Sequence, residues 1–499
     1  MARGSFVASL LRMTRRGTAP QDDIGGDKLL RISKNERNRI RLDMVHQYKS
    51  HGFNIVLDVE SGAVHIVDDV VYDLIPFMEK NESVSVNEAS RLTGGKYPDT
   101  DLMEAVNEIN ELRDKGLLYT KDIYEPYVEK FSEERLDKGI VKAMCLHIAH
   151  DCNLRCKYCF AGKGEYHGER SLMSFEVGAK ALDYLIEHSG NRVNLEVDFF
   201  GGEPTMNFEV VKRLVEYGRS REKEHNKKFR FTLTTNGLLL NDEILDFANK
   251  EMGNLVLSID GRKEVNDRMR PTANGKGSYD VILPGFLKAA EKRGQTNYYV
   301  RGTYTHFNTD FAQDVLHLHD LGFEQISVEP VVCDPKEEYA LREEDLPVLL
   351  QQYDILADEI IKRRKSGRYI NFFHFMIDLE GGPCIAKRLS GCGSGGEYLA
   401  ITPTGDIYPC HQFVGEEKFL MGNVFDGITN PEIGEEFARC NVYSKKECRE
   451  CFAKFYCSGG CSANSYHATG DINGNYSFGC ELQRKRIECA IMIKAALED

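Results

Sequence analysis

The sequence lacks a run of about 20 apolar residues, which is the length that a helix needs to cross a bilayer. It also lacks a secretory signal, because the apolar core at 6–11 is shorter than the roughly 7 to 15 residues expected. Positive charge is in deficit, and the net charge of -14 argues against a duplex nucleic acid partner. Tryptophan is absent, and this absence excludes no function. We therefore expect a cytoplasmic protein that binds neither membranes nor nucleic acid.

Length and composition indicate several folded domains after an atypical start. At 499 residues the expectation is about three domains, and the 41% hydrophobic content can supply a sizeable core. Residues 1–44 carry ten Lys or Arg against five acids, with many Gly, Ser and Thr. We interpret this stretch as a disordered basic leader. A transit peptide and a start codon placed too early are alternatives, the latter because Met44 opens a segment that reads as folded.

The fifteen cysteines are unevenly distributed, with three between 152 and 159 and nine between 384 and 480. The missing signal and the odd count argue against a disulfide framework. Clustered thiols in a reducing compartment more often bind metal. The other three, Cys145, Cys333 and Cys489, are expected to be small buried apolar side chains.

Between the two cysteine groups, the chain alternates strand-like and helix-like stretches. A helical stretch such as 175–190 has apolar residues at three- and four-residue spacing and closes on a glycine. Six such units predict an α/β fold, with a parallel sheet curled into a partial (β/α)6 barrel whose sites form at the carboxyl ends of the strands. The predicted strands span 143–150, 194–204, 228–237, 254–261, 298–308 and 325–332.

Cys152, Cys156 and Cys159 directly follow the first predicted strand, with CxxxCxxC spacing. Three thiolates at this spacing can hold a cuboidal iron-sulfur cluster and leave its fourth iron open. A structural zinc site needs four protein ligands and usually shows CxxC pairs, so zinc is the poorer match.

Four strand-end motifs together resemble the radical S-adenosylmethionine (SAM) enzymes. The cysteine triplet follows the first strand, GGEP (201–204) the second, TTNG (234–237) the third and SIDG (258–261) the fourth. The resemblance covers about residues 140–335. It implies that SAM chelates the open iron of a 4Fe-4S cluster and is cleaved to a 5'-deoxyadenosyl radical, which abstracts a hydrogen atom from the substrate.

The GGE of the second motif is a candidate binding site for the methionine end of SAM. The resemblance implies that Gly201 and Gly202 let the backbone approach SAM closely and that Glu203 takes its ammonium group. Local packing or turn chemistry is the alternative for these residues.

Further candidates come from the loops around the first and fourth strands. Ser258 and Arg270 match SAM-binding positions of related peptide-modifying enzymes, and a guanidinium suits a carboxylate. Tyr158 and Phe160, on either side of Cys159, would shield the cluster or meet the adenine. Packing is again the alternative.

The C-terminal cysteines fit a second template. Twelve residues, Gly405 and four more residues separate Cys392 from Cys410, and 448–461 reads CxxCxxxxxCxxxC. This spacing resembles the SPASM extension, which carries two auxiliary 4Fe-4S clusters, so the resemblance implies three 4Fe-4S clusters in all. A zinc ribbon, which shares the CxxC pairs, is the alternative. The match assigns Cys448, Cys451, Cys457 and Cys480 to an outer cluster, and Cys392, Cys410 and Cys461 to an inner one.

Two residues near the inner cluster bear on the mechanism. Cys384 could complete that cluster, or it could be a spare thiol if one iron stays open to bind a cysteine thiolate of the substrate. In sulfatase-maturing relatives an aspartate acting as base follows the cysteine that is Cys410 here, whereas this chain has His411. The departure counts against sulfatase maturation, although histidine can also act as a base.

The segment before the barrel predicts a small domain of a hairpin and three helices. A hairpin closed near Gly62 and a helix fill 52–78, and two more helices are expected at 86–93 and 99–116. The unit resembles the winged-helix-like module of peptide-modifying enzymes, which can take a leader peptide as an added strand. Its acidic third helix disfavours DNA binding. The apolar face of that helix is Leu102, Val106, Ile109 and Leu112.

Three longer stretches, 54–74, 150–174 and 398–415, look like the maturases of SCIFF peptides, which have six cysteines in forty-five residues. The resemblance implies a Cys-rich precursor peptide with a leader, whose thiols are joined as thioethers to carbons of neighbouring residues, often a threonine α-carbon. It also implies a reducing electron donor such as flavodoxin or ferredoxin.

Two alternatives remain open. One is another radical SAM/SPASM modifier that makes formylglycine or a carbon-carbon crosslink, and the other is an iron-sulfur electron-transfer or metal-stabilised binding protein. The expected organisation is a leader (1–44), a peptide-recognition domain (45–125), a radical SAM core (140–335), linker helices (336–383) and a SPASM domain (384–499).

Overall fold

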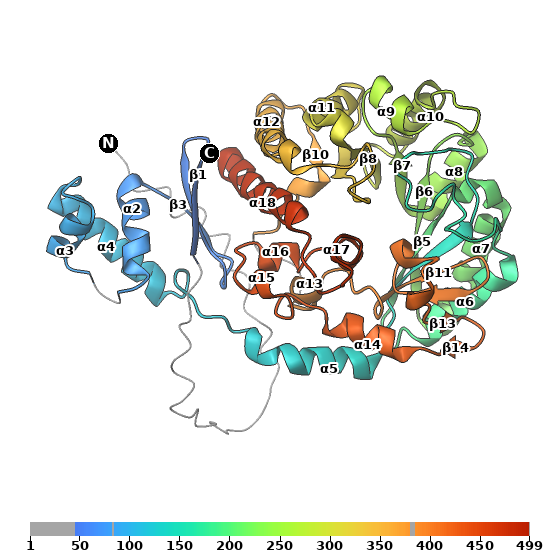
Figure 1. Ribbon diagram of the computed structural model, residues 1–499, viewed down its shortest axis with the longest axis horizontal. Coiled ribbons are helices and arrows are strands. Elements are labelled where there is room, and N and C mark those ends of the chain that lie inside the picture. The colour runs from blue at the N-terminus through green and yellow to red at the C-terminus, as the bar shows by residue number, and fades with distance from the viewer. Residues whose placement is uncertain (1–44, 82–83, 380–384, 499) are drawn as a thin grey trace.

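The computed structural model describes residues 45–81, 84–379 and 385–498. The predicted basic leader and Cys384 lie outside the described residues. Within the described part, no helix is long and apolar enough to cross a membrane. Figure 1 shows a small blue domain beside an arc of green and yellow strands and helices, with orange and red segments between the two.

A single sheet of eleven strands, in the order β10-β9-β8-β7-β6-β5-β4-β11-β12-β13-β14, forms the centre of the molecule. It is parallel from β10 to β11, and β4 to β9 follow chain order. All six predicted strands form, and the curled parallel sheet with helices outside it confirms the predicted partial barrel (Figure 1). The six predicted strands are β4 (Ala143–Ala149), β5 (Asn194–Gly201), β6 (Lys228–Thr235), β7 (Met252–Ser258), β8 (Tyr298–Tyr304) and β9 (Gln325–Pro330). The short strand β10 (Asn371–Phe372) was not predicted.

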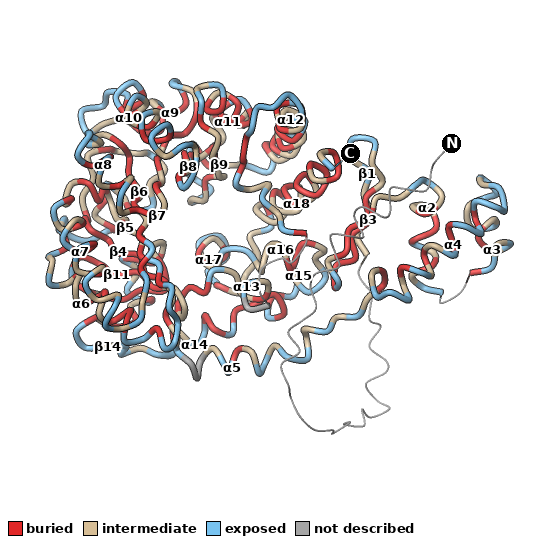
Figure 2. Tube along the Cα trace, turned by 180° about the vertical axis from the view of Figure 1, so that it is seen from behind, coloured by how far each residue is buried: buried red, intermediate tan, exposed pale blue. Residues whose placement is uncertain are grey.

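Helices follow the strands because their apolar residues recur at helical spacing and their first turns are capped. The side chain of Ser174 accepts a hydrogen bond from Val177 N at the start of α6, and Asn241 does the same for Ile244 N at the start of α8. Buried residues follow the strands and the helix sides that face them (Figure 2). The helices are α6 (Phe175–Glu187), α7 (Phe208–His225), α8 (Asp242–Glu251), α9 (Lys263–Met269), α10 (Tyr279–Lys292) and α11 (Phe311–Asp320).

The two faces of the parallel sheet carry different side chains. Leu257, Val300 and Ile326 lie in register on β7, β8 and β9 and are fully buried, as expected for the face that the helices cover. Successive side chains of a strand point to opposite faces. Their neighbours Ser258 and Arg301, also in register, therefore share the inner face, where side chains are partly accessible.

The sheet continues from the barrel into the C-terminal region. β11 (Tyr398–Ile401) pairs in parallel with β4, and β12 (Asp406–Tyr408), β13 (Gly422–Asn423) and β14 (Gly427–Ile428) extend the sheet by antiparallel pairing. The other elements here are helices, and α18 packs along α12. These helices are α12 (Leu346–Lys365), α13 (Ile385–Ser390), α14 (Pro431–Arg439), α15 (Lys446–Arg449), α16 (Lys454–Cys457), α17 (Ser462–Thr469) and α18 (Ser477–Glu498).

The small N-terminal domain has three antiparallel strands and three helices. The predicted hairpin and helices form, and all four residues of the predicted apolar face are buried. The first strand was not predicted, because its residues are only partly buried and show no clear alternation. The elements are β1 (Val45–Ser50), β2 (Phe53–Asp58), β3 (Val64–Val67), α2 (Asp69–Met78), α3 (Val86–Leu92) and α4 (Asp99–Asp114).

The N-terminal domain docks on the C-terminal region through a buried charged contact. Lys454 Nζ lies 2.6 Å from Glu60 Oε1 and 3.4 Å from Asp122 Oδ2, and its side chain is 3% exposed. Tyr443 donates a 2.7 Å hydrogen bond to the same Asp122. Helix α5 (Val128–Lys138) then leads from this domain along the C-terminal region to the barrel (Figure 1).

Candidate active site and cysteine groups

The loop after β4 brings the cysteine triplet together. Cys152, Cys156 and Cys159 are all partly buried. Burial raises the pKa of Cys152 to about 12, and the nearby charges of Glu203 and Cys156 act in the same direction. Burial likewise raises the pKa of Cys156 to about 11, with Cys159 contributing. Three thiols therefore lie within one small region, and a positive metal centre would favour their thiolate forms.

One guanidinium faces all three thiols. Arg270 is only 7% exposed, and its positive charge lowers the pKa of each cysteine of the triplet against the effect of burial. Its Nη1 donates to Tyr158 Oη at 2.9 Å, and Tyr158 in turn donates to the Asp260 carboxylate at 2.8 Å. Among the described residues, Nε of Arg270 is buried without a hydrogen-bond partner. An unpaired buried N–H costs about 1–3 kcal/mol, so this site favours an anionic ligand such as a carboxylate.

Glu203 follows β5, is buried, and accepts hydrogen bonds from residues at the end of β6. Its Oε1 accepts hydrogen bonds from Thr205 N at 3.0 Å and Thr235 Oγ1 at 2.8 Å, and its Oε2 accepts one from Asn236 N at 2.7 Å. Burial raises the pKa of Glu203, while these donors lower it. Oε2 keeps acceptor capacity for a further donor, so the arrangement is compatible with the predicted ammonium contact.

Close contacts with the protein backbone explain why glycine occupies positions 201 and 202: Gly201 packs on Ala149, and Gly202 on Asp151. Gly201 has a φ of +114°, and a Cβ there would lie 2.4 Å from Ala149 O. A Cβ on Gly202 would lie 2.1 Å from Asp151 O. The end of β5 therefore packs directly against the start of the cysteine loop, which only glycine permits. Their contact with SAM stays a prediction.

The two remaining candidates differ in their surroundings. Ser258 ends β7 on the inner face and is partly buried. Phe160 is 42% exposed, and its ring centre lies 5.7 Å from that of His411 in the C-terminal region. This contact joins the triplet loop to the residue after Cys410.

The inner group of thiols also assembles. Burial raises the pKa of Cys410, and nearby Cys461 and Cys392 raise it further. Cys410 is buried, whereas Cys392 and Cys461 are exposed. Gly405 has a φ of +91° in the turn between β11 and β12, a conformation that glycine adopts readily and that leads the chain back to Cys410.

The outer group consists of four thiols on short helices and the start of α18. Burial raises the pKa of Cys457 to about 12, and Cys480, Cys448 and Cys451 act in the same direction. Lys445, which is 2% exposed, lowers the pKa of Cys448 and of Cys480. The charges of these four thiols act on one another beside a buried cation, and such a donor set suits a four-thiolate cluster.

The cysteines outside these groups have other surroundings. Cys440 and Cys489 are buried, and their Sγ atoms lie near Ile472 O at 3.5 Å and Asp354 Oδ1 at 3.7 Å. Cys145 is buried in β4, as predicted for an apolar side chain.

His411 is uncharged at neutral pH. Burial lowers its pKa to about 4, and Arg301 acts in the same direction. Its Nδ1 lies 3.4 Å from Tyr398 Oη. A neutral imidazole of low basicity can hold a hydrogen bond, and it is a weak general base.

Three charged residues beside the thiol groups were missed by the sequence analysis. Arg301 and Glu329 lie on the inner face of β8 and β9, and Lys445 lies beside the outer thiols. Alternation within the predicted strands would have placed the first two on a polar face. No spacing motif marks Lys445.

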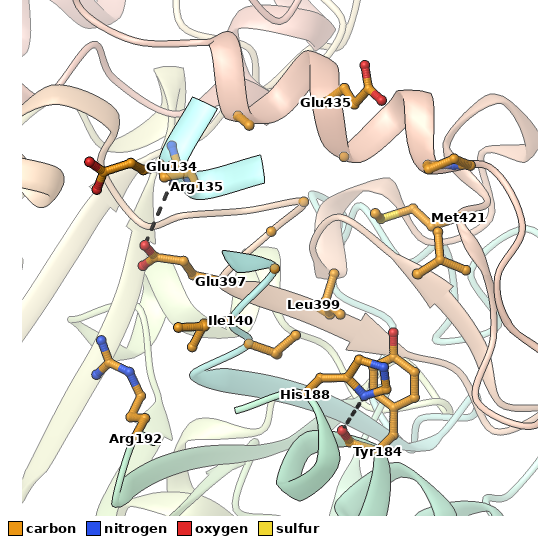
Figure 3. Close-up of a pocket in the computed structure, with 18 of the residues that line it drawn as sticks. Glu134, Arg135, Ile140, Tyr184, His188, Arg192, Glu397, Leu399, Met421 and Glu435 are labelled. Carbon is orange, nitrogen blue, oxygen red and sulfur yellow. Dashed lines mark hydrogen bonds and ion pairs between the residues drawn. The ribbon is translucent and has the colours of Figure 1, made fainter. Parts of the chain in front are cut away.

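A separate pocket of about 660 Å³ lies where α5, α14 and the segment between α5 and β4 meet (Figure 3). Arg135 and Glu397 face each other across it at 4.0 Å, and Tyr184 stacks on His188. None of the grouped cysteines lines it.

Comparison with known proteins identifies two domains in the chain. A family model described as the radical SAM superfamily matches residues 146–322, and the SPASM model, described as an iron-sulfur cluster-binding domain, matches residues 392–452. The chain therefore contains a radical SAM domain followed by a SPASM domain. The radical SAM domain binds SAM and a 4Fe-4S cluster, and the SPASM domain binds auxiliary iron-sulfur clusters.

Two curated relatives and one solved structure are similar over most of their lengths. The radical SAM cyclopropyl synthase TigE of Paramaledivibacter caminithermalis is 23% identical, over 85% of this chain and 89% of its own. A cysteine-type anaerobic sulfatase-maturating enzyme of Clostridium novyi is 25% identical, over 63% and 86%. The structure of anSMEcpe with bound AdoMet has a TM-score of 0.59 and 20% identity, over 72% and 98%, and shares the fold.

The residues present fit these cofactors. A donor set of three thiols faces a guanidinium with an unpartnered buried Nε, which suits a cluster and a carboxylate ligand. Cys152, Cys156 and Cys159 are the residues that would hold the SAM-binding cluster.

Proposed function

We propose that this enzyme installs thioether crosslinks in a ribosomally made, Cys-rich precursor peptide. The observation that carries the proposal is the contact between the triplet loop and the inner thiol group. Phe160 directly follows Cys159, His411 directly follows Cys410, and their ring centres lie 5.7 Å apart. A peptide held beside this contact would lie next to both groups of three thiols.

The proposed reaction joins a peptide cysteine sulfur to a carbon of a neighbouring residue. An S–H and a C–H bond break and one C–S bond forms, so the peptide loses one hydrogen atom, one proton and one electron. When bound, SAM and the clusters supply the 5'-deoxyadenosyl radical that takes the hydrogen atom and the electron acceptor that takes the electron. The chain's own residues bind the peptide, exclude water and accept the proton through a group not yet assigned.

Ligand assignments belong to the same proposal. We assign Cys448, Cys451, Cys457 and Cys480 to an outer 4Fe-4S cluster, and Cys392, Cys410 and Cys461 to an inner one. Arg270, Ser258, Tyr158 and the GGE of 201–203 are assigned to SAM. Flavodoxin or ferredoxin is the proposed electron donor.

A peptide substrate is supported by the relatives and by the N-terminal domain. One anSMEcpe structure contains a bound peptide, Cp18Cys, with a TM-score of 0.57 to this chain. The three-stranded sheet with α2–α4 at residues 45–125 supports the proposed peptide-recognition domain, which would take the leader as an added strand.

The direct test is an anaerobic assay of the reconstituted enzyme with SAM, dithionite and a Cys-rich peptide encoded beside its gene. We expect the peptide to lose two hydrogens for each bridge, with no free thiol at the bridged cysteine, as read by mass spectrometry after alkylation. Hydrogen loss with every thiol still free would indicate carbon-carbon crosslinking. Conversion of a cysteine to an aldehyde would indicate formylglycine formation, and an absence of 5'-deoxyadenosine would overturn the enzyme assignment.

Formylglycine formation is the second candidate, because sulfatase-maturating enzymes are among the relatives. His411, with its pKa lowered to about 4, stands where those enzymes have the aspartate base. A weak imidazole base at this position favours the thioether reaction over sulfatase maturation.

A further inference from the structure

An ion pair lies on the inner face of the barrel, on the neighbouring strands β8 and β9. Arg301 Nη2 on β8 lies 2.8 Å from Glu329 Oε1 on β9. Their side chains are 48% and 35% exposed, so the pair is accessible to a ligand even though the outer faces of both strands are buried. Accessible charges on the inner face of such a barrel are positioned to contact a substrate.

Strand register places this pair beside the candidate SAM residue Ser258. Ser258 is directly opposite Arg301 in the β7–β8 pairing, and Thr303 is opposite Glu329 in the β8–β9 pairing. Residues in register on neighbouring strands share a face, as do residues two apart on one strand. The side chains of Ser258, Arg301 and Glu329 therefore all project from the inner face near the carboxyl ends of the strands.

The charges of the ion pair also act on the region of the inner thiol group. The negative charge of Glu329 raises the pKa of Cys461, and it also raises that of His411, whose pKa Arg301 lowers. Such effects require proximity. Arg301 and Glu329 are thus close both to the predicted SAM site and to the inner thiols.

Positive charge is in excess around Glu329. Arg486 on α18 is 8% exposed and donates from Nε to Tyr353 Oη at 2.8 Å, while its Nη2 is buried without a partner among the described residues. Burial acts to raise the pKa of Glu329, but the positive charge of Arg301, with that of Arg486 added, outweighs it and helps to lower the value to about 2. Burial lowers the pKa of His374 to about 3, so that imidazole is neutral at pH 7. Glu329 therefore pairs with one guanidinium, and a second adds positive charge to its surroundings.

We propose that Arg301 and Glu329, with Arg486 beside them, bind the main chain of the precursor peptide at the residue that is modified. The inference rests on the proposed function, because it takes the substrate to be a peptide. A carboxylate that accepts an N–H and a guanidinium that donates to a C=O match the two polar groups of a peptide unit. A neutral peptide unit adds no charge that would break the ion pair.

The test compares Glu329→Gln and Arg301→Gln with a matched control. Arg230→Gln breaks the pair of Arg230 with Glu196, which lies in register near the amino end of β5 and β6. Two quantities are measured on reconstituted holoenzyme with the peptide of the previous assay: bridged product formed per 5'-deoxyadenosine, and affinity for the fluorescein-labelled peptide without its leader. Iron content and the electron paramagnetic resonance signals verify that each variant retains its clusters.

For the two test variants we expect the product ratio and the affinity each to fall by about tenfold or more, because a hydrogen bond to a charged group is worth about 1.5–3 kcal/mol. The Arg230→Gln control should match wild type in both quantities and in SAM cleavage without peptide. If both quantities stay within twofold, or if wild type does not bind the labelled peptide, the inference is overturned. Glu329→Asp and Arg301→Lys replace any variant that loses its clusters.

The outcomes separate this inference from the proposed reaction. If wild type forms bridged product and the test variants keep the wild-type product ratio and peptide affinity, the proposed peptide site is wrong but the proposed reaction is supported. If the test variants lose peptide affinity but wild type forms no bridged product, the proposed thioether reaction is wrong and the proposed peptide site is supported.

Discussion

The cysteine triplet and the outer four cysteines are assembled in different ways. The triplet lies within eight consecutive positions of one loop, and the ends of β5 and β6 support it through the backbone of Gly202 and the side chain of Asn236. The outer thiols are spread over 448–480 on short helices and the start of α18. The first group therefore depends on the sheet, and the second on the packing of short helices and on side chains such as Lys445 and Lys454 that join distant segments.

This difference shows what each region needs in order to form. The triplet loop stays in place as long as the parallel sheet is intact, because its contacts are to strand ends. The outer region also relies on the N-terminal domain, which reaches it through Lys454 between Cys451 and Cys457. Three predictions test the comparison.

Cys156→Ala and Cys451→Ala should separate the two groups most strongly. We expect Cys156→Ala to abolish SAM cleavage, by roughly a thousandfold or more, because that thiol is a proposed ligand of the cluster that SAM needs. Cys451→Ala should lower the iron content and stop peptide modification but retain SAM cleavage within about tenfold. Measuring 5'-deoxyadenosine and iron in both variants checks this. Equal loss of cleavage in the two would contradict separate roles.

Lys454→Met should detach the N-terminal domain from the outer cysteine region. The variant leaves Glu60 and Asp122 without their buried cation, which typically costs about 3–5 kcal/mol. We expect a lower midpoint of urea unfolding and faster hydrogen exchange in β2 and β3. Lys446→Met, at an exposed neighbouring position, is the control and should change neither. Unchanged exchange in Lys454→Met would show that the charged contact does not hold the domains together.

Asp198→Asn should have the smallest effect, confined to the barrel and dependent on pH. Burial raises the folded-state pKa of Asp198 from 3.8 to about 6, with Glu196 adding to the shift. A raised pKa contributes stability below the unfolded-state value, and that stability is lost as pH rises through about 6. Between pH 5 and 7.5 the wild type should therefore lose about 1–2 kcal/mol relative to the variant. Urea unfolding of both proteins at the two pH values measures this, and parallel curves would contradict it.

The sequence predicted the elements whose signals are local. Alternating strands, amphipathic helices and ordered strand-end motifs identified the barrel. The three groups of cysteine ligands that the spacing suggests stay a prediction. Strand β1 was missed because its pairing with β2 and its contacts with α18 decide its conformation more than its own pattern does. Arg301 and Glu329 were missed because single charged residues in a strand carry no spacing motif. Their significance depends on register, which arises only when the sheet forms.

The strand pairing between β4 and β11 joins the two domains into one sheet. Parallel pairing over four residues leaves little freedom for a hinge between the triplet loop and the turn that leads to Cys410. The distance between the triplet loop and this turn is therefore fixed by the sheet. In the proposed thioether reaction, this fixed distance would set how many residues separate the two crosslinked residues of the substrate. Inserting residues between them would test this limit more directly than substituting the crosslinked residues themselves.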